Sequence, residues 1–330
     1  MIARITLVGC LIASSAAAAG ERQIRFKNGD IDLAGSLLMP QGTGPFPSMV
    51  LLHGSGPETR DSLRPIAQRL VDAGFAALIF DKRGTGGSSG SWLKASLDDL
   101  ARDGAAALRA LTGQAEVDRG RAGLLAISQS GWYAPLVAAV EPSVRFLVVV
   151  TGGGAAPREV EWFGYERRLQ RANVSPGDVE KARRALRIYF DYLATGEGWN
   201  ELQRALDEGK GSAWVDALQL ERTLPSPRER SSWAWVATFD PVPAIEKMRI
   251  PVLLLFGGHD DLLPTDLSME RWATALRRSE ATATIREFPE AGHGLTLGAH
   301  HDSAAHVAPR FAVGYFEMVS SWLAALRLAD

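Results

Sequence analysis

The sequence predicts a doubly wound α/β fold, in which a mostly parallel sheet is interrupted by an inserted helical cap. Short apolar runs alternate with amphipathic segments, several of these runs are apolar almost throughout, and one long stretch has helical patterns only. Continuously apolar strands are typical of parallel sheets that are covered on both faces. With 330 residues, the chain is long enough to bury a large core of this kind.

Six apolar runs are expected to form strands of this sheet. They are residues 48–53, 76–81, 122–127, 146–151, 252–257 and 284–288. An amphipathic segment after the first run ends at Gly74, which is expected to cap it. Ser96 is expected to begin a second helix because acidic residues follow it in the first turn. The last helix is expected to carry an apolar face from Phe311 to Leu326.

The alternation stops between Pro157 and Phe239, where no convincing strand is found. We expect residues 157–239 to form the helical cap, and residues 20–156 and 240–330 to form the α/β core. The cap segment contains Trp162, Trp199, Trp214, Trp233 and Trp235. These tryptophans either fill the cap's own core or line a substrate pocket, and the sequence does not sort them.

Residues 1–19 resemble a secretory signal peptide. Arg4 is followed by a short apolar stretch and then by small residues up to Ala19, near which cleavage is expected. The apolar stretch is too short to be a permanent membrane span. We therefore expect an exported protein, either periplasmic or secreted. A lipoprotein anchor at Cys10 is a minor alternative, and since this is the only cysteine, a cysteine nucleophile is excluded.

The composition indicates a globular protein with no nucleic-acid partner. The net charge is −2, 46% of the residues are hydrophobic, and no block of lysine or arginine is present. The expected partner is a small molecule, and the oligomeric state is left open.

A serine directly follows the third apolar run, residues 122–127. Ser128 is followed by small residues and then by a helical segment, which is the layout of a nucleophile elbow, a sharp turn that exposes one side chain. Glycines usually stand where this chain has Ala126 and Ser130. We predict Ser128 as the nucleophile. Ser130 is the rival, but it would put the bulky Trp132 where the turn needs a small residue.

An acid and a base follow in the order that such a serine needs. Asp260 comes just after the run 252–257 and is preferred over Asp261, which is expected to cap the turn. His293 is flanked by glycines after the last strand and is the expected base. His259 competes only weakly, because it directly precedes the acid.

Two backbone amides are expected to form the oxyanion hole. One belongs to Gln129, directly after the nucleophile, and the other to Ser55, in the glycine-rich loop after the first run. His53 then belongs to the architecture of this loop rather than to the catalytic machinery.

Other motifs are weaker. His300, His301 and His306 lie close to Asp302 and suggest a metal site, but exposed polar residues before a helix explain them as well. The sequence Ser91-Trp92-Leu93-Lys94 fits S-x-x-K without its companion motifs, and residues 84–90 miss the G-x-G-x-x-G spacing. We therefore predict neither a metal nor an organic cofactor.

With these residues identified, nearly all of the mature chain resembles the serine α/β-hydrolase superfamily. The likeness is greatest to bacterial hydrolases of the dienelactone hydrolase, S9 and S33 peptidase-like and acyl-CoA thioesterase-like groups. Five local matches carry it: residues 53–57, 81–84, 127–132, 239–241 with 251–257 and 260, and 292–294. The resemblance implies that Asp81 and Arg83 brace the loop beside the elbow and are not catalytic.

The sequence therefore predicts an exported serine hydrolase that cleaves small carboxylic esters. Dehalogenase and epoxide hydrolase chemistry is disfavoured, because those relatives carry an aspartate at the elbow. One alternative is an aminopeptidase of the proline-iminopeptidase kind, in which Glu159, Glu161 or Glu166 would hold a free amine. Thioester hydrolysis is a second, and a non-catalytic binding module on the same fold is a third, against which the complete set of catalytic candidates argues.

Overall fold

The computed structural model describes residues 20–220, 224–298 and 309–326. Its sheet has the strand order β1-β2-β4-β3-β5-β6-β7-β8. The strands are β1 (Gly20–Asn28), β2 (Ile31–Met39), β3 (Phe46–Leu52), β4 (Ala76–Phe80), β5 (Val117–Ile127), β6 (Leu147–Val150), β7 (Val252–Gly257) and β8 (Ala283–Phe288). Strands β3 to β8 pair in parallel, and β1 and β2 are antiparallel to their neighbours. The predicted mostly parallel sheet is confirmed.

The hairpin of β1 and β2 was not among the predicted strands. Most of β1 is exposed at the edge of the sheet, so it has no continuous apolar run. Only Ile24 and Phe26 pack partly against the core. The two-residue turn that joins the strands is Gly29-Asp30, in which Gly29 has a φ of 57°, and glycine at the first position of such a turn is a known hairpin signal.

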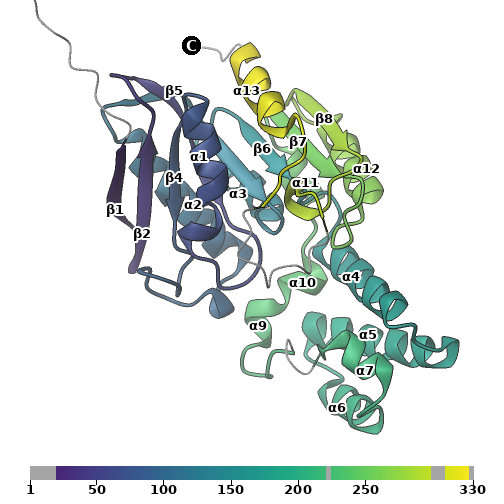
Figure 1. The fold of residues 1–330 in the computed structure, drawn as a ribbon. Coiled ribbons are helices and arrows are strands. Elements are labelled where there is room, and N and C mark those ends of the chain that lie inside the picture. Colours follow the sequence, from purple (N-terminus) through teal and green to yellow (C-terminus); the bar gives the residue numbers. More distant parts are fainter. Residues whose placement is uncertain (1–19, 221–223, 299–308, 327–330) are drawn as a thin grey trace, which may run out of the picture.

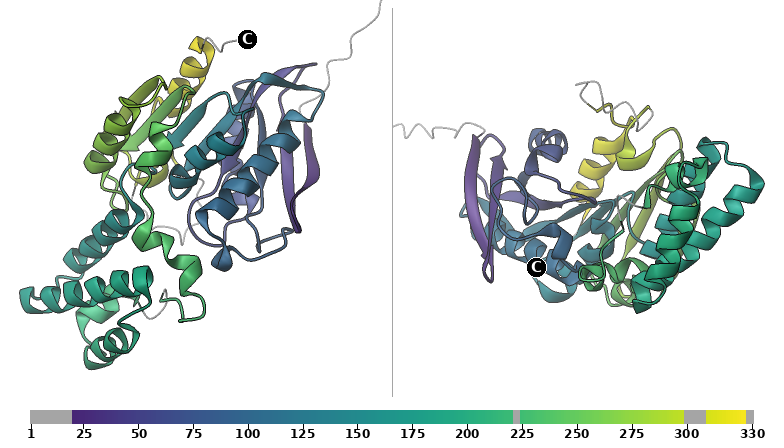
Figure 2. Two further views of the ribbon diagram at one scale, coloured as in Figure 1. Left: turned by 180° about the vertical axis from the view of Figure 1, so that it is seen from behind. Right: turned by 90° about the horizontal axis from the view of Figure 1, so that it is seen from below.

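Helices cover both faces of the sheet. They are α1 (Arg64–Asp72), α2 (Leu97–Thr112), α3 (Ser130–Val140), α11 (Val242–Glu246), α12 (Thr265–Leu276) and α13 (Tyr315–Ala325). Helices α1 and α13 pack on one face, whereas α2, α3, α11 and α12 pack on the other (Figures 1 and 2).

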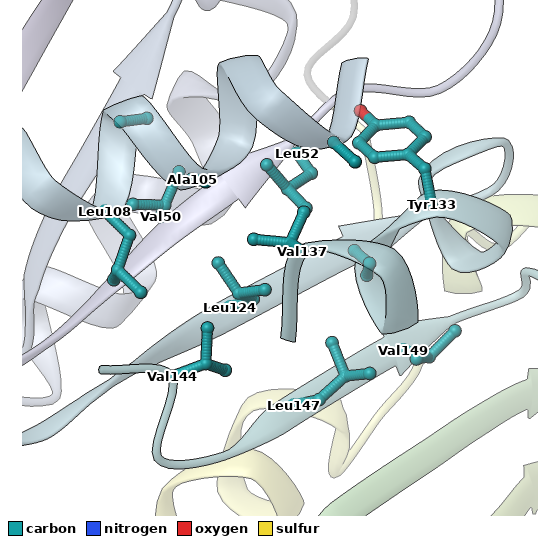
Figure 3. Close-up of a cluster of buried hydrophobic side chains, with 14 of the residues drawn as sticks. Val50, Leu52, Ala105, Leu108, Leu124, Tyr133, Val137, Val144, Leu147 and Val149 are labelled. Atoms are coloured by element: carbon teal, nitrogen blue, oxygen red, sulfur yellow. The ribbon is translucent and has the colours of Figure 1, made fainter. Parts of the chain in front are cut away.

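Alternate residues of the central strands point to the two faces. In β3, Met49 and Leu51 face α1, whereas Val50 and Leu52 face α2 and α3. Figure 3 shows Val50 and Leu52 packed with α2 and α3, next to Leu124 of β5. Burial on both faces explains why these strands are apolar throughout.

Helix ends follow local signals, with one correction. Ser96 caps α2, since its Oγ accepts the N–H of Asp99 at 3.1 Å. Helix α13 begins at Tyr315 and not at Phe311 as expected, because Gly314 has a φ of 82° and stops the helix from extending further back. Phe311 instead forms an isolated β-bridge with Thr296.

The described residues between β6 and β7 form helices joined by loops and contain no strand. They include α4 (Pro157–Arg171), α5 (Pro176–Thr195), α6 (Trp199–Glu208), α7 (Ala213–Leu218), α9 (Arg230–Trp233) and α10 (Trp235–Thr238). These helices gather beside the sheet (Figure 1) and share an apolar core of their own, which includes Trp214. No helix in the described parts of the chain is both long and apolar enough to cross a membrane.

Candidate active site

Ser128 lies at the sharp turn between β5 and α3. Its φ of 56° is in the left-handed region, which residues other than glycine rarely adopt. Neighbouring glycines leave room for this turn. A Cβ at Gly152 would lie 2.3 Å from the carbonyl oxygen of Ser128, and a Cβ at Gly131 would lie 2.4 Å from the carbonyl carbon of Gly152. The turn therefore requires glycine at positions 131 and 152. The two positions that usually hold glycine in such an elbow are Ala126 and Ser130 in this chain.

The hydroxyl of Ser130 is taken up by the backbone beneath the turn. Its Oγ accepts the N–H of Ile127 at 2.6 Å and lies 2.8 Å and 3.1 Å from the carbonyl oxygens of Ile127 and Leu52, to which it can donate. The side chain is completely buried. Ser130 thus ties the ends of β5 and β3 together, and it has no free hydroxyl for attack or for contact with a substrate.

His293 and Asp260 meet at the carboxyl end of the sheet. Nδ1 of His293 lies 2.8 Å from Oδ2 of Asp260. The other carboxylate oxygen, Oδ1, accepts the N–H groups of Leu262 and Leu263, both at 2.9 Å. Because a carboxylate only accepts, the ring proton is on Nδ1 and Nε2 is left as the basic nitrogen.

The competing acid and bases lie elsewhere. Asp261 forms an ion pair with Arg171 of α4 at 2.8 Å, and the neighbouring His259 is exposed. His53 is buried with its ring edge against Phe80. Burial lowers the pKa of His53 to about 3, so this ring stays neutral.

Ser128 and His293 line one cavity of about 230 Å³. Ser55 and Thr151 lie in the wall on the side of the sheet, and Leu262 and Leu263 lie beside the histidine. Helix α4 forms the opposite wall with Val160, Glu161, Gly164 and Arg168. The nucleophile and base candidates therefore line the same cavity as residues of the helical segment.

Ser55 and Gln129 lie next to this pair. Within the described residues, the backbone N–H groups of Ser55 and Gln129 have no hydrogen-bond acceptor. Gln129 is the N-terminal cap of α3, where backbone N–H groups have no partner within the helix. Two such donors close to the candidate nucleophile are suited to stabilising an oxyanion.

A lysine that the sequence reasoning missed links these two segments. Nζ of Lys82 donates to the carbonyl oxygens of Gly54 and Gly56, at 2.8 Å and 3.2 Å, and to Oε1 of Gln129 at 2.9 Å. Lys82 thereby contacts the residues on both sides of Ser55 as well as Gln129. It is buried, and burial lowers its pKa to about 8 against the opposing influence of Glu58. In the stretch Asp81-Lys82-Arg83-Gly84, the sequence predicted a role for Asp81 and Arg83 but none for the lysine between them.

Those two residues form buried ion pairs. Asp81 pairs with Arg60 at 2.9 Å and accepts the N–H of Gly87. Arg83 pairs with Asp103 of α2 at 2.7 Å. Both therefore make contacts suited to bracing the loop after β4.

Thr151 is the second residue that the sequence reasoning missed. It follows β6 with a φ of 45°, which is unusual for a β-branched residue. Its Oγ1 accepts the N–H of Gly294 at 3.0 Å, directly after His293. Nothing in the local sequence marks this contact, because it joins residues that are 143 positions apart.

No group of three or more histidine, cysteine, aspartate or glutamate side chains that could hold a metal is found in the parts of the chain that the structure describes. His300, His301, Asp302 and His306 lie outside those parts. The same is true of the expected signal peptide, residues 1–19.

A family model described as "Alpha/beta hydrolase family" matches residues 49–307. The chain belongs to this family. The match extends from β3 past the candidate histidine, so it includes every candidate residue of the site. The fold and the family that the sequence predicted are both confirmed.

Curated relatives of this alpha/beta hydrolase match it over short segments. A "Putative carboxymethylenebutenolidase" of Escherichia coli strain K12 is 33% identical over 83 residues, which is 25% of this chain and 26% of the relative. Esterase EstD of Thermotoga maritima is 40% identical over 58 residues, 16% of this chain and 14% of EstD. The chain thus covers about a quarter or less of the length of these relatives.

Solved structures resemble this alpha/beta hydrolase over most of its length. DcsB, solved in complex with a substrate analogue, has a TM-score of 0.60 at 18% identity, over 94% of this chain and 100% of DcsB. Proline iminopeptidase of Mycobacterium smegmatis has a TM-score of 0.57 at 16% identity, over 92% of this chain and 98% of that one. At these identities the likeness shows the fold alone.

Proposed function

We propose that this alpha/beta hydrolase is an exported serine esterase that cleaves small carboxylic esters. The observation that carries the proposal is the 2.8 Å contact between His293 and Asp260, because it leaves the basic Nε2 of the histidine in the cavity that Ser128 also lines. The esterase names among the partial relatives agree with this chemistry.

In the proposed reaction, Nε2 of His293 takes the proton of Ser128 while Oγ of the serine forms a bond to the ester carbon. The negative charge on the former carbonyl oxygen is held by the N–H groups of Ser55 and Gln129. The protonated His293 then gives its proton to the leaving alcohol oxygen, and the carbon–oxygen ester bond breaks. Water attacks the acyl-serine by the same route and releases the acid.

Asp260 supports this cycle through geometry and charge. It holds the histidine in one tautomer and stabilises the imidazolium that forms during attack. Its own carboxylate is fixed by the N–H groups of Leu262 and Leu263. His293 can therefore accept and release the proton without a change in the orientation of its ring.

One observation favours aminopeptidase activity as a second candidate. Of the three cap glutamates considered for amine binding, Glu159 pairs with Arg271 and Glu166 with Arg183. Glu161 instead lines the cavity beside Ser128, where burial raises the pKa of its carboxyl group. An aminoacyl substrate would pair its ammonium group with Glu161 because of this position, and the ammonium charge would favour the ionised carboxylate against the effect of burial.

A panel of p-nitrophenyl esters of increasing chain length, assayed beside aminoacyl p-nitroanilides, separates these functions. The proposal predicts faster turnover of esters, which is abolished in Ser128→Ala. Faster turnover of anilides that depends on Glu161 would favour the peptidase. Inertness toward both series and toward a fluorophosphonate would instead indicate a binding module.

A further inference from the structure

A second cavity of about 250 Å³ adjoins the one that contains Ser128 and His293. The two cavities share Ser55, Glu161 and Arg168 in their walls. Of the two residues proposed to hold the oxyanion, Ser55 lines both cavities and Gln129 lines the second, so the second cavity lies next to both donors. A group attached to the reacting carbon can therefore extend from the serine into this space.

Five aromatic side chains line the second cavity. They are Trp92, Tyr165, Tyr189, Trp233 and Trp235. The Trp92 ring, from the core, meets the Trp233 ring, from α9, edge to face with their centroids 6.2 Å apart. Aromatic rings prefer such edge-to-face and offset contacts with further rings. Cavities of about 150 Å³ accept benzene, so this one has room for a single ring and its linking atoms.

Three charged residues line this cavity: Lys82, Glu161 and Arg168. All three N–H bonds of the Lys82 ammonium are directed at protein acceptors, so it leaves no donor for a ligand. Glu161 and Arg168 lie at the junction of the two cavities. The other residues of the lining, which include Trp92, Leu93 and Trp233, are uncharged. Nζ of Lys82 lies 6.0 Å from the centroid of the Trp92 ring, but its donors are taken up by the protein, so the cavity is suited to an uncharged ring.

The position of His293 decides which part of an ester enters. This histidine must deliver a proton to the leaving oxygen, and it lines the first cavity but not the second. The alcohol part therefore leaves beside His293, and the acyl part extends past the oxyanion donors. We propose that the second cavity binds the acyl group, and that the preferred substrates are esters of arylacetic-type acids with one aromatic ring. This inference rests on the proposed esterase function.

Methyl phenylacetate and benzyl acetate test it, because they are isomers that carry the same ring on opposite sides of the ester. Rates are compared with methyl acetate and corrected for alkaline hydrolysis of each ester. We expect kcat/KM for methyl phenylacetate to exceed that for methyl acetate by about 10–100-fold, with little gain for benzyl acetate. Trp92→Ala and Trp233→Ala should each lower the ratio of kcat/KM for methyl phenylacetate to that for methyl acetate by about tenfold.

Trp199→Ala is the matched control, since Trp199 is a half-buried cap tryptophan that lines neither cavity. It should keep the preference of the wild type. A preference for benzyl acetate, or an acyl preference that both cavity variants retain, overturns the subsite while the esterase function stands. If none of the esters is hydrolysed and Ser128 does not react with a fluorophosphonate, the esterase function fails and the subsite falls with it.

Discussion

Oδ2 of Asp260 lies 2.8 Å from Nδ1 of His293, although the two residues are 33 positions apart. Asp260 follows β7 and His293 follows β8, and these strands are parallel neighbours. Parallel pairing brings the loops after both strands to the same edge of the sheet, where the elbow after β5 also lies. The contact is therefore a consequence of the strand order.

Asp260→Asn should lower kcat by about 10³–10⁴-fold, because an amide in place of the carboxylate favours the wrong tautomer of His293. Asp261→Asn is a matched control at the next position. Asp261 only pairs with Arg171 near the surface, so the control should retain activity within about threefold. Equal losses in both variants, measured with one ester, would contradict the assignment of the acid.

Lys82→Met should lower kcat by about 10–100-fold with little change in KM, because it disconnects the two segments that carry the oxyanion donors. The wild-type rate should also fall as the pH rises through about 8, where this lysine loses its proton. Lys82→Arg stays charged at that pH and should move the fall to higher pH. A Lys82→Met enzyme with the wild-type kcat would rule out this role.

Ser130→Ala should reduce stability more than activity. The variant leaves the partly buried N–H of Ile127 without its Ser130 acceptor, at a cost of about 1–3 kcal/mol in the free energy of unfolding. Denaturant unfolding measures this cost, and ester hydrolysis should stay within a few-fold of the wild type. Loss of activity in a variant that is as stable as the wild type would restore Ser130 as a catalytic candidate.

Thr151→Val should lower kcat by about tenfold, because the Gly294 N–H loses its acceptor and the loop that carries His293 is less well held. Thr151→Ser keeps the hydroxyl and should recover most of the rate. The comparison uses kcat and KM for one ester, and we expect KM to change little. If the serine variant is as slow as the valine variant, the hydroxyl is not what positions the loop.

The sequence predicted the parts of the fold that local patterns encode. The parallel strands are recognisable because burial on both faces requires continuous apolar runs, and Ser96 is recognisable because capping is a local interaction. Strand β1 was missed because an exposed edge strand needs no such run. Lys82 and Thr151 were missed because their contacts join segments that meet only in the folded chain. The orientation of the Ser130 hydroxyl is likewise a property of the folded turn.

Labelling with a fluorophosphonate shows whether Ser128 forms the covalent bond to the substrate. Trypsin releases residues 122–145 as one peptide that contains Ser128, Ser130 and Ser143, so fragment ions must locate the adduct. We predict an adduct on Ser128 alone, no labelling and no ester turnover in Ser128→Ala, and normal labelling in Ser130→Ala. An adduct on another residue, together with ester turnover that survives in Ser128→Ala, would contradict the account.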